Sequence, residues 1–170
     1  MPIAMTAFHI SLLVGAAALL VVAAVNDVMS YRIPNEICGA ILIFFPLFVF
    51  TAPHAIDWVQ HCLVFALILA AGFALFLGHL VGAGDIKLLA VTGLWAGPHN
   101  VALFLLETAV AGGAVALGIA ALTYVRNRPS RRGQNPAVAL ARVPIPYGLA
   151  IAFGGLHALF RLSQPILFPG

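Results

Sequence analysis

The first long apolar stretch of this chain is TAFHISLLVGAAALLVVAAV, which runs from Thr6 to Val25. It carries no charged side chain, and a helix of this length can cross the ~30 Å hydrocarbon core of a bilayer. The stretch is longer than the apolar region of a typical signal peptide, and no Lys or Arg precedes Arg32. These features predict a retained first transmembrane helix.

The composition of the whole chain agrees with a membrane protein. Hydrophobic residues make up 63% of it and charged residues 8%, whereas a soluble domain has roughly 25% charged residues. Such a chain cannot cover the surface of a soluble protein, so its solvent is expected to be lipid. The length favours a single domain, residues 1–170. The net charge of +3 does not indicate nucleic-acid binding, because the basic residues fall in predicted membrane loops.

Five more apolar segments follow, and together they predict an all-α, polytopic membrane protein with six transmembrane helices. The segments are residues 6–25, 36–50, 58–78, 86–96, 101–124 and 145–162. The second and fourth are short for a ~30 Å core. We expect the fourth to gain a turn or to be shielded by other helices.

The basic residues alternate between the predicted loops. The loops Thr51–Asp57 and Gly97–Asn100 carry no Lys or Arg. Seven of the eight basic residues lie in the other loops: Arg32, Lys87, Arg126, Arg128, Arg131, Arg132 and Arg142. The positive-inside rule therefore places these loops in the cytoplasm and both termini outside. It also places Asp27 and Asp85 on the same, cytoplasmic face.

Asp27 and Asp85 are the candidate catalytic residues. Asp27 follows the first apolar segment, and Asp85 directly precedes the fourth, where a helix dipole favours its ionised form. Each alone could be an ordinary polar residue at a helix end. However, a carboxylate at bilayer depth costs roughly 2.5–3.5 kcal/mol, which makes each a candidate for function. As a pair, one could take a proton from water while the other, protonated, polarises a scissile carbonyl.

The connection that follows Asp27 contains three candidates for a supporting role: Arg32, Pro34 and Asn35. Arg32 could hold Asp27 ionised or reach the lipid headgroups. Pro34 is expected to force a turn, and Asn35 to cap the second helix.

Three residues near Asp85 are further candidates. Gly82 and Gly84 lack side chains, so a peptide backbone could approach closely there. Lys87 could tune Asp85 or anchor the chain at the headgroups. Away from this face, Glu107 is expected to be a protonated or hydrogen-bonded packing residue.

Three patches of the sequence resemble the prepilin peptidases, which are membrane aspartic proteases of the GxGD type. The first is DVMSYRIPN at residues 27–35, the second is GAGDIKLL at residues 82–89, and the third is PIPYG at residues 144–148. They occur in the order found in that family. The resemblance implies that Asp27 and Asp85 form the catalytic pair. It also implies a protein substrate, a prepilin or pseudopilin, whose short basic leader is removed at the cytoplasmic face of the bacterial inner membrane.

The larger members of the family carry paired Cys-x-x-Cys zinc motifs and a methyltransferase activity. Here the two cysteines, Cys38 and Cys62, lie far apart. The chain therefore resembles the short, monofunctional type that processes Flp-type (Tad) pilins. Archaeal preflagellin peptidases share the same motifs, so these motifs do not separate the two types. No residues show metal-ligand spacing, so we expect neither a metal nor another cofactor.

A proton-coupled transporter that uses Asp27 and Asp85 as proton carriers is the alternative. A transporter would more naturally carry its carboxylates near the membrane midplane and show internal repeats. Here both lie at the membrane boundary, and no repeat is visible. A non-catalytic assembly subunit is a third option.

Overall fold

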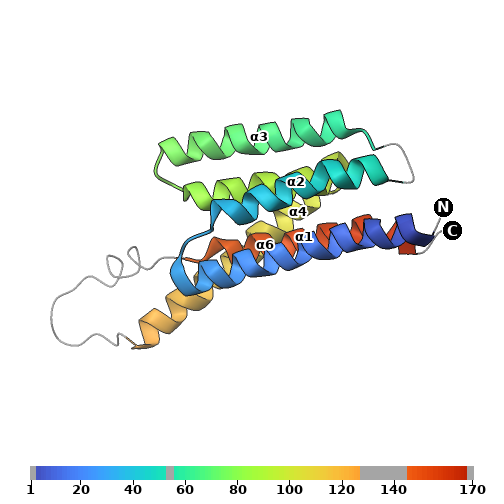
Figure 1. Ribbon diagram of the computed structural model, residues 1–170. Helices are drawn as coiled ribbons and strands as arrows, with labels where there is room; N and C mark the ends of the chain where they lie inside the picture. Colours follow the sequence, from blue (N-terminus) through green and yellow to red (C-terminus); the bar gives the residue numbers. More distant parts are fainter. Residues whose placement is uncertain (1–2, 53–55, 127–144, 168–170) are drawn as a thin grey trace, which may run out of the picture.

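The computed structural model describes residues 3–52, 56–126 and 145–167. All elements of this described part are α-helices, which confirms the predicted all-α class. Figure 1 shows that the first described helix begins and the last described helix ends at the same end of the helical bundle. The helices are α1 (Ile3–Ser30), α2 (Asn35–Thr51), α3 (Trp58–Leu77), α4 (Ala83–Arg126) and α6 (Tyr147–Leu167).

Helix α4 consists of two helical stretches separated by a sharp change of direction. Its 44 residues would measure ~66 Å as one straight helix, about twice the hydrocarbon core of a bilayer. Gly97 has the non-helical angles φ 65° and ψ −178°, which a residue with a side chain rarely adopts. The two halves, residues 83–96 and 98–126, contain the predicted fourth and fifth segments.

The break in α4 is stabilised by a histidine from α3. Pro98 has no N–H group, so the carbonyl of Leu94 loses its usual donor within the helix. The Nδ1 atom of His61 lies 2.7 Å from this carbonyl oxygen, and because a carbonyl only accepts, Nδ1 is the donor. A Cβ atom at Gly97 would collide with the same imidazole ring. Glycine, proline and histidine together therefore fix the kink.

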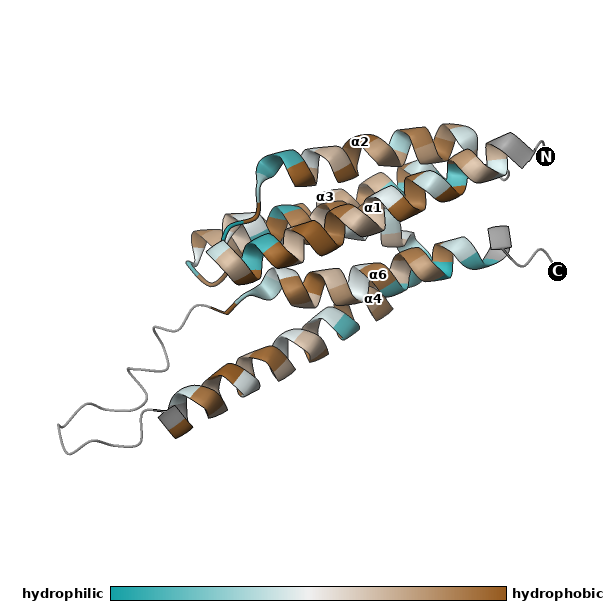
Figure 2. Cartoon of the chain, turned by 60° about the horizontal axis from the view of Figure 1, so that its bottom comes forward, coloured by the Kyte–Doolittle hydropathy of each residue, from teal (hydrophilic) through white to brown (hydrophobic). Residues whose placement is uncertain are grey.

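Among the described residues, three helical segments are long and apolar enough to cross a membrane: Met5–Ser30, Trp58–Leu77 and Ala83–Thr123. The third contains the kink at Gly97. Helix α2 is apolar but has only 17 residues. Figure 2 shows hydrophobic residues along much of the length of the helices, with hydrophilic ones at the start of α2. The crossing of a bilayer by all six predicted segments stays a prediction.

Helix α6 packs against both α1 and α4, while α2 contacts α1 and α4, and α3 packs on α4. Small residues let these helices approach closely. A Cβ atom at Gly72 would lie 2.5 Å from Ile86, and one at Gly155 would lie 2.5 Å from Thr92. Such contacts are typical of helices that pack in lipid, where van der Waals fit rather than the hydrophobic effect drives association.

A polar pair joins α6 to the second half of α4. The Nδ1 atom of His157 and the Oε1 atom of Glu107 lie 2.6 Å apart. The expectation that Glu107 is a hydrogen-bonded packing residue is confirmed.

Candidate active site

Both candidate aspartates line one cleft at an end of the bundle. Asp27 lies near the end of α1, and Asp85 lies in the first turn of α4. The cleft has a volume of about 730 Å³. It lies where α1 ends and where α2, α4 and α6 begin (Figure 1). Five of the predicted supporting residues also line the cleft: Arg32, Pro34, Asn35, Gly82 and Gly84.

The carboxylate of Asp27 is held by the first turn of α6. The backbone N–H of Gly148 donates to Oδ2 of Asp27, with an N–O distance of 2.7 Å. Gly148 is the second residue of α6, where backbone N–H groups have no partner within the helix and favour an anion. A Cβ atom at Gly148 would lie 2.9 Å from both Cβ and Oδ2 of Asp27. Only glycine allows α6 to approach Asp27 this closely.

Asp85 is held locally, within the start of its own helix. The carbonyl of Gly82 accepts the first helical bond, from the N–H of Ile86, at 3.2 Å. The carboxylate of Asp85 lies against Gly82, where an added Cβ atom would meet its Oδ2 atom at 2.9 Å. An acidic residue at the third helical position turns back in the same way toward the residue that precedes the helix in a capping box. The structure therefore confirms that Asp85 lies at the entrance of a helix.

Gly84 brings the first turn of α4 close to the connection between α1 and α2. A Cβ atom at Gly84 would lie 3.4 Å from Cβ of Ile33, which is the limit of ordinary van der Waals contact. In the described structure, Gly84 therefore contacts Ile33. Close approach of a peptide backbone at Gly82 or Gly84 stays a prediction.

The predicted capping role of Asn35 was wrong. Helix α2 begins at Asn35 itself, its N-cap is Pro34, and no side chain caps it. An N-cap side chain must precede the first helical residue, so Asn35 is one position too late. Its Oδ1 atom instead accepts a hydrogen bond from Nζ of Lys87, at 2.9 Å. Lys87 thereby ties the first turn of α4 to the first turn of α2.

Arg32 makes no ion pair with Asp27 in the part of the chain that the structure describes. Helix α1 ends in a left-handed turn: Tyr31 has φ 51°, and its N–H donates to the carbonyl of Asp27 at 2.8 Å. Such a turn is a common way to end a helix, although glycine is the usual residue there. The side chain of Arg32 is exposed, which fits the alternative that it reaches the lipid headgroups.

Gly148 is the functional candidate to which the sequence analysis gave no role. The PIPYG patch that contains it was noticed only for its resemblance to a known family. A glycine in the first turn of a predicted helix was the available signal, since such a position combines free N–H groups with room for another element. Tyr147 and Ile145, from the same patch, also line the cleft.

Two carboxylates that line one cleft can divide the acid and base roles of a hydrolysis between them. Among the described residues, no group of three or more His, Cys, Asp or Glu side chains could hold a metal ion. Independence from metals stays a prediction.

The model of the type IV leader peptidase family matches residues 14–117, which is more than half of the chain and includes both aspartates. No curated protein and no solved structure matches the chain.

Proposed function

This chain belongs to the type IV leader peptidase family, and we propose that it is an aspartic endopeptidase whose catalytic pair is Asp27 and Asp85. The observation that carries this proposal is the convergence of the two carboxylates in one cleft. They come from helices far apart in the sequence, and the backbone N–H of Gly148 holds the carboxylate of Asp27. The proton-coupled transporter is not favoured, because the matching family is one of peptidases.

The proposed reaction is the hydrolysis of a peptide bond by water. One carboxylate accepts a proton from water, whose oxygen attacks the scissile carbonyl carbon. The other carboxyl group donates its proton to the carbonyl oxygen, giving a tetrahedral intermediate. Collapse of this intermediate breaks the C–N bond, and the leaving nitrogen takes up the proton that came from water. One hydroxyl group of the intermediate returns its proton to the second carboxylate as the C=O bond of the product forms, so both carboxyl groups return to their starting states.

The family implies a prepilin as substrate, and we propose one of the Flp type, with a short basic leader followed by an apolar helix. The cysteine pattern supports this choice. Cys38 and Cys62 lie on different helices, and the sequence contains no Cys-x-x-Cys motif of the kind found in the larger members.

We also propose six membrane crossings, with the cleft at the cytoplasmic face of the bacterial inner membrane. The distribution of basic residues supports this orientation. Arg32 lines the cleft, and Lys87 lies at the same end of the bundle, where it donates to Asn35. The second half of α4, which ends at Arg126, also ends on this side (Figure 1). Basic residues are retained on the cytoplasmic side.

The activity is tested by co-expression with a precursor that has a basic leader, a glycine and a long apolar helix. Mass measurement of the precursor is expected to show loss of the leader only when the peptidase is present. If no such precursor from the same genome is shortened, the peptidase proposal is wrong.

The orientation is tested by cysteine labelling in a variant that lacks Cys38 and Cys62. Cysteines introduced at Ala52 and His99 should react with an impermeant reagent in intact cells. A cysteine at Ser30 should react only after the membrane is opened, as should one at Ser130, which lies outside the described residues. The opposite pattern would place the cleft outside the cytoplasm.

A further inference from the structure

An apolar groove lies between α1 and α6, and the residues that line it on α1 lie on both sides of Asp27 in the chain. Its volume is about 360 Å³, and every side chain that lines it is apolar. Val25 and Val28 contribute from α1, while Leu149 and Phe153 contribute from α6. The groove is therefore distinct in chemistry from the cleft that holds the two carboxylates.

Along α1, the groove passes the position of the candidate catalytic residue, from Val21 to Met29. Val28 follows Asp27 in the chain, and Leu149 follows Gly148, whose N–H group binds Asp27. From Asp27 the groove continues along α1 to Val21, six residues or ~9 Å of helix rise away. It thus extends from the level of Asp27 into the apolar part of the bundle over nearly two helical turns.

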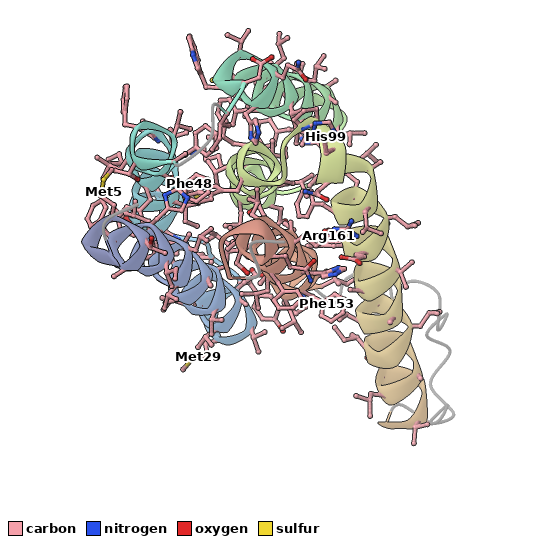
Figure 3. The ribbon with its side chains drawn as sticks, turned by 90° about the vertical axis from the view of Figure 1, so that its right-hand side faces the viewer. Met5, Met29, Phe48, His99, Phe153 and Arg161 are labelled. Carbon is pink, nitrogen blue, oxygen red and sulfur yellow. The ribbon has the colours of Figure 1, made fainter. Side chains whose placement is uncertain are left out.

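The groove opens to the surface that would face lipid. Val25 is 50% exposed and Phe153 is 61% exposed. Among the described helices, α1 packs extensively only against α2 and α6. Figure 3 shows Met29 and Phe153 toward the same, lower side of the bundle in that view.

We propose that this groove binds the apolar helix of the precursor, immediately after the bond that is cut. The proposal rests on the proposed function, in which the leader is removed just before such a helix. A scissile carbonyl within hydrogen-bond reach of Asp27 forces the first turns of that helix to lie within ~10 Å of this residue. Of the two clefts, only the apolar groove offers this helix a path that stays in lipid.

The floor of the groove suits a helix as the occupant. Ala24 and Ala152 line it and are 6% and 3% exposed, so two small residues lie where another helix backbone would approach. Small residues at such positions allow the close packing on which helix association in lipid depends. A lipid chain could fill the same space, but it would not be connected to the peptide bond held at Asp27.

The test uses a photo-crosslinker in the full-length protein carrying Asp85→Asn, so that the precursor is bound without being cut. Phe153 is replaced by p-benzoylphenylalanine, with the same replacement at Phe73 as the control. Phe73 lies on α3 and is 57% exposed, so the two sites match in residue type and exposure. We expect a crosslink to the precursor from position 153, mapped to the first two turns of its apolar helix, and none from position 73.

Kinetics provide the second readout. Phe153→Ala should raise KM for the precursor several-fold with little change in kcat, whereas Phe73→Ala should change neither. Crosslinks from position 153 to lipid or to a second copy alone, or equal behaviour of the two positions, would overturn the docking site. If the unmodified protein does not cut the precursor at all, it is the peptidase proposal that fails.

Discussion

Asp27 and Asp85 each lie against a glycine at a helix N-terminus, but over very different separations in the chain. The partner of Asp85 is Gly82, three residues before it. The partner of Asp27 is Gly148, 121 residues after it. The first contact forms with one turn of α4, whereas the second requires α6 to pack against α1.

This difference means that the two carboxylates depend on the fold to different degrees. Asp85 keeps its position as long as the first turn of α4 is intact. Asp27 keeps its position only if α6 has the correct depth and rotation against α1. We therefore expect changes at the contact between α1 and α6 to affect catalysis more than equivalent changes at the start of α4.

The comparison has meaning only if both carboxylates take part in the reaction. Replacement of either aspartate should therefore have the largest effect on cleavage. Asp27→Asn and Asp85→Asn preserve size and remove the charge. Since a general acid or base contributes roughly 10²–10⁴-fold, each variant should lose cleavage by at least this range. The measurement is the mass of a co-expressed precursor, at matched amounts of membrane-inserted enzyme. Near-normal processing by either variant would exclude that residue from the mechanism.

Gly148→Ala should produce the next largest effect. The added methyl group would lie 2.9 Å from Cβ of Asp27, an atom close to the backbone that cannot move alone, so α6 and α1 must separate. Misplacement of a reacting group by about 1 Å can cost about 10²-fold in rate, and we expect a loss of this order in kcat.

The control for Gly148→Ala is Gly113→Ala in the second half of α4, where no atom lies within 4 Å of the new methyl group. It should cleave the precursor at the normal rate. A Gly148→Ala enzyme as active as this control would show that the contact between α1 and α6 does not position Asp27.

Gly82→Ala should be less harmful than Gly148→Ala. The new methyl group would lie 2.9 Å from Oδ2 of Asp85, which is the end of a side chain and can turn away. The rate should fall, but less than in Gly148→Ala when both are measured on the same precursor. A larger loss in Gly82→Ala would reverse the comparison and make Asp85 the more sensitive carboxylate.

The smallest effect is expected from Gly84→Ala, because its methyl group would meet Ile33 at 3.4 Å, an ordinary contact. Gly84→Val adds branches at this limit and should reduce cleavage strongly, since overpacking typically costs about 1–3 kcal/mol. Rates and thermal stability in detergent check both variants. Full activity of Gly84→Val would show that no close approach is needed at this glycine.

Features that arise within a few residues were predicted well. The apolar segments gave the positions of the helices, including the break near Gly97, because length, hydropathy and Gly-Pro signals act locally. The place of Asp85 in a first helical turn also followed from its neighbours. The capping role of Asn35 failed by one residue, since Pro34 starts the turn and leaves Asn35 inside the helix.

Contacts between helices could not be predicted in the same way. Gly148 with Asp27, Lys87 with Asn35, and His61 with Leu94 each join different helices. In a soluble protein, an apolar stripe indicates which face of a helix is buried. In lipid, the outer and inner faces are both apolar, so the pattern of residues does not say which faces meet. The sequence by itself therefore determined the helices and the two acidic residues at their ends, and only the packing of α6 against α1 and α4 determined how those residues are held.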